Sequence, residues 1–387
     1  SQSDPQVGDN NTLVRFAFDA TTQTIRGQAE VIPNFRTFLL NSVGELKGEG
    51  EKPGLEGGLN IEGIAWDPDP GRERLLIGLR SPLLFPDMHK ATERILRARA
   101  QGEPVYIYGD YDVDGASSSA LLARFLGGHD VRSRIYIPDR IFEGYGPNAA
   151  AIEQLVKEGA KLIVTVDCGT TSFEPLAVAK KLKTDCLVID HHQADEKLPD
   201  VLAVVNPNRQ DDVSGQGTLC AAGVVFLVLV AVTRELRKRN YYAGGRRELD
   251  LLSLLDIVAL ATVADVVPLT GLNRAYVKKG LTVMHARENI GLRALADAAA
   301  LSQAPTPYHL GFILGPRINA GGRIGDAGLG AKLLSTEDPI EAQRIAELLD
   351  RLNKERKAIE TAMLEEAMGL GDITLMAMIG SFLGWQM

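Results

Sequence analysis

The stretch YIYGDYDVDG, residues 106–115, decides the fold. It places Asp110, Asp112 and Asp114 directly after an apolar run that begins at Val105. A short run of apolar, aromatic and β-branched residues predicts a buried strand, so the three carboxylates are expected at the strand's carboxyl end. Like charges a few Å apart disfavour one another's ionisation, so the stretch raises the question of what holds them together.

Predicted strands and helices alternate around this stretch. An amphipathic helix, DMHKATERILRARAQ, precedes it and is closed by Gly102. Further strands are predicted at residues 134–137, 162–166, 186–189 and 203–205, and helices at residues 116–126, 150–158, 173–181 and 220–237. This alternation predicts β-α-β units and a parallel sheet. A helix near residues 251–261, the Gly-rich segment LGPRINAGGRIGDAG and a long helix over residues 339–368 follow.

The predicted fold class is α/β, with four parts of unequal size. Residues 1–84 form a small β-rich segment, with a strand at TLVRFAF and an antiparallel hairpin at IEGIAWDPDPGRERLLIGLRS. Residues 85–270 form a parallel-sheet catalytic domain, and residues 271–368 form a helical connector with a Gly-rich loop. Residues 369–387 are a divergent tail. The N-terminal segment is expected to be incomplete, because one or two hairpins cannot close a β-propeller.

Composition excludes several classes of protein. The formal net charge of −8 argues against a uniformly basic nucleic-acid binder, although a local basic groove stays possible. No apolar run is long enough for a spanning helix, and the polar start SQSDPQVGDNN has no signal-peptide pattern. The three cysteines fit neither a zinc pattern nor an even disulfide framework. We therefore expect a cytoplasmic protein with reduced thiols and no membrane partner.

Further acids and two histidines follow the later strands. The strand in LIVTVDCG ends in Asp167, and the strand in CLVIDHH ends in Asp190, His191 and His192. The later helical segment ALATVADVVPL supplies Asp265. Ligands of open α/β sheets bind beyond the carboxyl ends of the strands, so these groups are expected to converge. Cations would stabilise such a cluster, and mixed oxygen and nitrogen ligands favour Mn²⁺ or Mg²⁺ over structural zinc.

Each signal also has a structural interpretation. A single Asp-x-Asp after a strand is more often a turn or the metal site of another α/β fold, such as the haloacid-dehalogenase phosphatases, which have no use for Asp-His-His. The histidine pair could cap a helix, Asp256 could replace Asp265, and PRINAGGR could be a flexible connection. Asp110 is expected to be a turn or supporting residue rather than a ligand, and Cys168 to be a packing residue.

Five segments, in order, resemble the DHH phosphoesterases, and among them the RecJ-type exonucleases. The segments are YGDYDVDGASS, VTVDCGT, VIDHH, ALATVADVVPLTGLNR and LGPRINAGGRIGDA, and the likeness covers about residues 85–368. The resemblance implies two-metal hydrolysis of single-stranded DNA from its 5′ end, in DNA repair and recombination. Residues 1–84 weakly resemble an uncharacterised bacterial family with propeller-like blades.

The resemblance also implies roles for individual residues. Asp112 and Asp114 would bind separate metals, Asp167 would bridge them, and His191 and Asp265 would bind the second. His192 would lie beside the scissile phosphate. Tyr108 stands where many relatives have a histidine, which implies a looser first metal. Because guanidinium groups suit phosphate and glycine allows close approach, we assign the Gly-rich loop to the DNA backbone, through Arg317, Asn319 and Arg323.

The ends of the chain depart from this resemblance. RecJ-type proteins continue into a substrate-binding domain and an oligonucleotide-binding barrel, and ITLMAMIGSFLGWQM matches neither. We therefore expect a truncated catalytic core with weak activity, and protein partners cannot be assigned. Two other functions stay open. The chain could cleave short oligonucleotides or cyclic dinucleotides, or it could be an inactive metal- or DNA-binding module.

Overall fold

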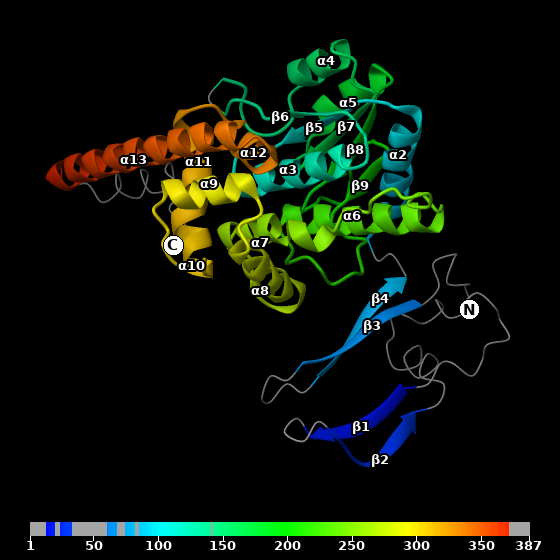
Figure 1. Cartoon of the computed structure of the whole chain (residues 1–387). Coiled ribbons are helices and arrows are strands. Elements are labelled where there is room, and N and C mark those ends of the chain that lie inside the picture. The colour runs from blue at the N-terminus through cyan, green and yellow to red at the C-terminus, as the bar shows by residue number, and fades with distance from the viewer. Residues whose placement is uncertain are drawn as a thin grey trace. The chain divides into compact units, whose positions relative to one another are not determined.

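The structure, a computed structural model, describes residues 85–140 and 142–370, with four strands ahead of them (Figure 1). Side chains are described up to residue 364. The chain divides into two compact units between Leu84 and Phe85. The predicted tail, residues 369–387, lies almost wholly outside the described residues.

A five-stranded parallel sheet forms the centre of the second unit. Its strands are β5 (Val105–Gly109), β6 (Ser133–Tyr136), β7 (Leu162–Val166), β8 (Asp185–Ile189) and β9 (Ala203–Val205). Their order across the sheet is β6-β5-β7-β8-β9. All five residues of β5 and of β7 are buried, as expected for strands covered by helices on both faces.

Helices cover both faces of this sheet (Figure 1). They are α2 (Met88–Gln101), α3 (Val113–Gly127), α4 (Ala149–Lys157), α5 (Phe173–Lys181) and α6 (Ala221–Lys238). One face, carrying Tyr106, Tyr108 and Ile163, packs against Ile152 of α4 and Leu176 of α5 in a continuous core. The helices α2, α3 and α6 pack together and contact the sheet strands β9, β5 and β8 respectively.

The α/β prediction is confirmed, and one of its boundary errors is informative. Helix α3 begins at Val113, whereas the sequence predicted its start at residue 116. The Asp112 carboxylate accepts hydrogen bonds from the backbone N–H groups of Asp114 and Gly115, at 2.9 and 3.0 Å. Asp112 is therefore the N-cap of α3, so the aspartate motif is the first turn of a helix rather than a loop before it.

The second half of the unit is helical. A 3-10 turn at Leu251–Leu254 leads into α7 (Leu255–Ala264), which is followed by α8 (Gly271–His285), α9 (Ile290–Ala298), α10 (Pro307–His309), a π-helical turn at Leu310–Leu314, α11 (Gly315–Ile324), α12 (Leu329–Ser335) and α13 (Pro339–Leu370). The prediction of a Gly-rich loop was wrong, because PRINAGGR lies in α11. Its glycines allow close packing: a Cβ on Gly322 would lie 2.8 Å from the Tyr111 carbonyl oxygen. Within the described residues, no helix is long and apolar enough to span a lipid bilayer.

The first unit contributes two antiparallel pairs. β3 (Asn60–Asp67) pairs with β4 (Arg74–Ser81), which confirms the predicted hairpin. β1 (Leu13–Asp19), the predicted strand, pairs with β2 (Thr24–Ile32). The sequence did not single out β2 as a strand.

Strand order locates the functional edge of the sheet. Strand β5 has β6 on one side and β7 on the other. The connection after β5 therefore leads to one side of it, and the connection after β6 leads back to its other side. In open α/β sheets the crevice at such a reversal is where ligands bind. Asp110, Asp112 and Asp114 follow β5, and Asp167 follows β7. The acids therefore flank the reversal point.

Close backbone packing between α7 and α8 yields one prediction about stability. A Cβ on Gly280 of α8 would lie 2.1 Å from the Leu255 carbonyl oxygen. Gly280→Ala is therefore expected to lower the free energy of unfolding by about 3 kcal/mol, measured by urea denaturation. Gly127→Ala is the control, because nothing lies within 4 Å of a Cβ there and its φ is ordinary. Equal stability of the two variants would contradict this account of the packing.

Candidate metal centre

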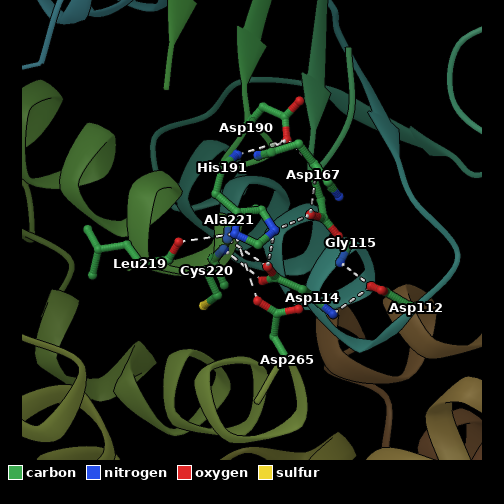
Figure 2. Close-up of polar contacts among 12 residues, drawn as sticks. Asp112, Asp114, Gly115, Asp167, Asp190, His191, Leu219, Cys220, Ala221 and Asp265 are labelled. Carbon is green, nitrogen blue, oxygen red and sulfur yellow. Dashed lines mark hydrogen bonds and ion pairs between the residues drawn. The ribbon is translucent and has the colours of Figure 1, made fainter. Parts of the chain in front are cut away.

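Asp114 is anchored by the start of another helix. Its two carboxylate oxygens accept hydrogen bonds from the backbone N–H groups of Ala221 and Ala222, at 2.6 and 2.8 Å. These are the first two residues of α6, whose N-terminal N–H groups favour an anion. Asp114 is fully enclosed, so its position is fixed from both α3 and α6 (Figure 2).

His191 points its ring into the same space (Figure 2). Its Nδ1 lies 3.1 Å from the Leu219 carbonyl oxygen, and because a carbonyl only accepts, Nδ1 must carry the proton. The Nε2 lone pair then faces Asp167 Oδ1 at 3.3 Å and Asp114 Oδ2 at 3.7 Å. A lone pair directed at carboxylate oxygens is unfavourable, so either a proton on Nε2 or a metal ion must lie between them. This tautomer is the one that a metal-binding histidine needs.

The side chains form three overlapping groups with metal-ligand spacing. Asp110, Asp112 and Asp167 form one group, Asp114, His191 and Asp265 form the second, and Asp167, His191 and His192 form the third, with the ligand atoms of each group within 4.8 Å of one another. Asp167 belongs to two groups and His191 to two. The carboxylate that could serve two ions at once is therefore that of Asp167.

Asp167 is held in an uncommon backbone conformation. Its φ is 62°, in the left-handed region that non-glycine residues seldom adopt, and its N–H donates to the Ile189 carbonyl oxygen at 3.0 Å. Backbone strain of this kind costs on the order of 1–3 kcal/mol and clusters at functional sites. It turns the carboxylate from the end of β7 toward α3.

The structure places Asp110, which the sequence predicted to be a turn or supporting residue, in one of these groups. Its carboxylate is buried, lies in a group with Asp112 and Asp167, and has one oxygen with no hydrogen-bond donor. Like Asp112, Asp110 also accepts a backbone hydrogen bond, from the Tyr111 N–H. The signal that could have identified it is its position as the first residue after β5, at the carboxyl edge of the sheet.

Burial and crowding raise the proton affinity of these acids. Burial, and then the charge of Asp112, raise the pKa of Asp110 to about 7. Burial, and then the charges of Asp114 and Asp112, raise the pKa of Asp265 to about 8. Burial and the neighbouring carboxylates also raise the pKa of Asp167 well above its usual range. These carboxylates are thus poorly stabilised by the protein alone, and a cation would lower their pKa values.

Asp190 behaves differently and serves as a support. Its carboxylate accepts hydrogen bonds from the N–H groups of Thr170, His191 and His192, and from His192 Nδ1 at 2.7 Å. Burial alone would raise its pKa, but the hydrogen bonds from His192 and Thr170 hold the pKa of Asp190 below its usual range. The bond to Asp190 in turn raises the pKa of His192 to about 9, so the imidazole carries a proton at neutral pH.

Sequence reasoning missed two residues in the segment between β6 and α4. The Tyr145 hydroxyl lies 3.3 Å from His192 Nε2, and Tyr145 is 61% exposed, so its ring borders solvent. Arg140 lies over the Tyr111 ring, 4.9 Å from its centroid. Both belong to the segment between β6 and α4, PDRIFEGYG. The signal was present, since an arginine and a tyrosine follow a strand at the functional edge.

The three residues assigned to the Gly-rich loop have three different surroundings. Arg317 is paired with Asp350 at 2.9 Å and donates to the Ile313 carbonyl oxygen at 2.7 Å. Asn319 accepts a hydrogen bond from the Val113 N–H, so it positions the start of α3. Arg323 is partly buried near Tyr111 and Arg140. The structure thus brings Asn319 and Arg323 to the aspartate motif, and of the two arginines Arg323 is the candidate phosphate contact.

The remaining alternatives lie apart from the cluster. Asp256 is buried, with its carboxylate bonded to the N–H of Ile257 at 2.7 Å and to Asn289, whereas Asp265 is grouped with Asp114 and His191. Cys168 is buried in the core beneath the sheet edge, and all three cysteines are free thiols. Tyr108 donates a hydrogen bond to the Gly146 carbonyl oxygen at 3.1 Å.

The residues present fit divalent metals. Buried Asp110 and Asp167 each have an oxygen without a hydrogen-bond donor, and the His191 lone pair faces carboxylates. Carboxylate oxygens with a single imidazole nitrogen are the ligands of Mn²⁺ and Mg²⁺, and no thiolate is among them. The cluster therefore offers the donor set that two such ions would need.

A parallel sheet with aspartates after its first strand and Asp-His-His at its carboxyl edge defines the DHH class of proteins. Accordingly, the profile of the DHH family, N-terminal domain, matches residues 104–262. The single-stranded-DNA-specific exonuclease RecJ of Dickeya dadantii is 38% identical over 304 residues, which cover 77% of this chain and 52% of that protein. The chain therefore spans about half the length of such curated relatives.

Solved structures agree with this class. A crystal structure of exonuclease RecJ bound to manganese is 32% identical, with a TM-score of 0.68, and the likeness covers 78% of each chain. RecJ of Thermus thermophilus in complex with Mn²⁺ is 30% identical with a TM-score of 0.66, covering 78% of this chain and 45% of that one. The chain belongs to the RecJ family.

Proposed function

We propose that this chain hydrolyses phosphodiester bonds of single-stranded DNA from the 5′ end, using two Mn²⁺ or Mg²⁺ ions, within DNA repair and recombination in the cytoplasm. The observation that carries the proposal is a pair of ligand groups, Asp110–Asp112–Asp167 and Asp114–His191–Asp265. The third group links them, because it contains both Asp167 and His191. RecJ relatives bearing the names and metals reported above support the substrate and the ions. We further propose that residues 85–270 form the catalytic domain and residues 271–368 its connector.

The proposed ligands follow from the geometry. Asp110, Asp112 and Asp167 would hold one ion, and Asp114, His191, Asp265 and Asp167 the other. When bound, two such ions lower the pKa of a water between them and stabilise charge on the attacked phosphate. The protein's contribution is to fix the carboxylates, through the caps at Asp112 and Asp114 and the strained backbone at Asp167.

His192 and the nearby cations would bind the substrate phosphate. Protonated His192 is held at one nitrogen by Asp190, which leaves Nε2 directed toward Tyr145 at the rim of the site. A fixed cation there suits a phosphate oxygen. Arg323 and Arg140, which both lie near Tyr111, are the proposed contacts to the backbone of the strand. Arg317 is not part of this proposal, because its guanidinium group is paired with Asp350.

The polarity and strand preference can be tested directly. With Mn²⁺, purified protein is expected to release labelled mononucleotides from the 5′ end of a single-stranded 40-mer, and to degrade a blunt duplex far more slowly, because only a separated strand fits a narrow groove. Chelation with EDTA should stop the reaction. Comparable rates on blunt duplex, release from the 3′ end, or cleavage of dinucleotides alone would contradict the proposal.

A further inference from the structure

The end of α6 and the segment that follows it are unusually basic for an acidic protein. Residues 234–247 read RELRKRNYYAGGRR and contain six cations, whereas the chain as a whole carries a net charge of −8. Part of this charge is neutralised. Arg237 pairs with Glu248, Lys238 with Glu235, and Arg239 with Glu93. Arg246 and Arg247, beyond the two glycines, are exposed.

Two arginines lie against the ring of Tyr241. The Arg99 guanidinium, from the last turn of α2, lies 3.7 Å from the ring centroid, and that of Arg246 lies 4.8 Å from it. Arg246 also donates to the Tyr241 carbonyl oxygen at 3.3 Å. We call Arg99, Tyr241, Arg246 and Arg247 the arginine–tyrosine patch. Within the part of the chain that the structure describes, no ion pair of 4 Å or less joins these arginines to a carboxylate.

The neighbouring side chains hold this patch in place. Tyr242 lies 2.9 Å, through its hydroxyl, from Nε2 of His129, and Nδ1 of His129 lies 2.7 Å from the Phe125 carbonyl oxygen near the end of α3. The His129 ring is buried and packs 4.2 Å from the Phe125 ring, centroid to centroid. The two arginines are therefore presented by a segment tied to α2 and α3, rather than by an isolated loop.

The patch lies far from the metal centre, at the opposite ends of the same helices. Helix α6 begins where Ala221 binds Asp114 and runs 18 residues to Lys238, just before the patch. At 1.5 Å per residue it is about 27 Å long. Helix α3 likewise begins at Val113, directly after Asp112, and ends at Gly127, two residues before His129. The patch therefore occupies the amino-terminal edge of the sheet, away from the proposed catalytic residues.

We propose that the arginine–tyrosine patch is a second contact site for single-stranded DNA, which binds the phosphate backbone of the strand away from its reacting end. The inference rests on the proposed function and extends it. Guanidinium groups suit phosphate oxygens, and no carboxylate among the described residues is paired with these arginines. Two arginines already cover the Tyr241 ring, which restricts stacking of bases on it. The contact is therefore expected to be independent of sequence.

Substrate length separates the two sites in an experiment. At the stacked spacing of about 3.4 Å per nucleotide, a trinucleotide spans about 10 Å and cannot reach from the metal centre to the patch, whereas a 40-mer can. The test variant is Arg246→Glu/Arg247→Glu. The matched control is Lys278→Glu/Lys279→Glu, which makes the same charge change at two exposed neighbouring residues of α8. Arg247→Glu alone leaves the contacts to Tyr241 intact and guards against misfolding.

The expected result is about tenfold weaker binding of the 40-mer in EDTA for the test variant. Its plot of log affinity against log salt should be shallower by about 1.4, or about 0.7 for each lost contact to a single strand. Arg246→Lys/Arg247→Lys should keep most of the affinity, and trinucleotide hydrolysis with Mn²⁺ should change by less than about twofold. Unchanged 40-mer affinity, or an equal loss in the α8 control, would overturn the inference. Failure of the wild type to hydrolyse either substrate would instead refute the proposed function, and the binding measurement would still decide the patch.

Discussion

Asp167→Ala is expected to abolish Mn²⁺-dependent hydrolysis of single-stranded DNA, by a factor of about 1,000 or more, which corresponds to about 4 kcal/mol of activation free energy. The reason is that Asp167 lies in one group with Asp110 and Asp112 and in another with His191, so its loss removes the carboxylate that we propose to bind both ions. Bound Mn²⁺, measured by elemental analysis after gel filtration, should fall together with activity.

Two further variants make the measurement specific. Asp200→Ala is the control, because its side chain is 84% exposed and pairs only with Lys180 among the described residues. It should retain both metal and activity. Asp110→Ala should lower the Mn²⁺ content by about one ion per chain, contrary to the expectation from sequence that Asp110 is only a supporting residue. Equal Mn²⁺ content in the wild type and Asp167→Ala would remove the basis for a shared ligand.

The metal-free protein is expected to become markedly less stable as the pH rises. The pKa of Asp110 is raised to about 7 and that of Asp265 to about 8, against 3.8 for an ordinary aspartate. Between pH 4 and 8 the folded state therefore holds protons that the unfolded chain has released, so the free energy of unfolding falls across this range. In EDTA, the melting temperature should drop on the order of 10 °C between pH 5 and pH 8.

Metal and mutation should both reverse this trend. Mn²⁺ binds the ionised carboxylates of the folded state, so it should raise the melting temperature more at pH 8 than at pH 5. Asp110→Asn, which cannot ionise, should flatten the curve measured in EDTA. A melting temperature that is constant or rises with pH in EDTA would show that these acids are not crowded as the structure describes.

The sequence predicted the sheet well because its strands are short and the central ones, β5 and β7, are wholly buried. β7 and β9 were predicted with their observed ends, and α5 likewise. Parallel strands also bring their carboxyl ends to one edge, so the strand pattern alone predicted that acids distant in sequence would lie together. The grouping of Asp114, His191 and Asp265 follows from this topology, while the roles of those residues stay a prediction.

What could not be predicted depends on tertiary contacts. Glycine content suggested a loop for residues 315–324, but close packing against the Tyr111 backbone selects a helix, in which a side chain at Gly322 would collide. Arg317 was assigned to phosphate because no sequence pattern reveals that Asp350, in α13, binds it. The tautomer of His191 likewise depends on the Leu219 carbonyl group, which lies 28 residues away in sequence.

The bond between Asp114 and the start of α6 constrains how this chain can diverge. Asp114→Ala would remove a proposed ligand and would also leave the N–H groups of Ala221 and Ala222 buried without an acceptor. Among the described hydrogen bonds, no backbone N–H group uses the Asp265 carboxylate as its acceptor. A descendant that gave up catalysis could therefore replace Asp265 early and still fold, whereas its Asp114 would be retained long after hydrolysis was lost. Among homologues that have lost catalysis, an aspartate at position 114 would therefore indicate a structural requirement and not hydrolytic activity.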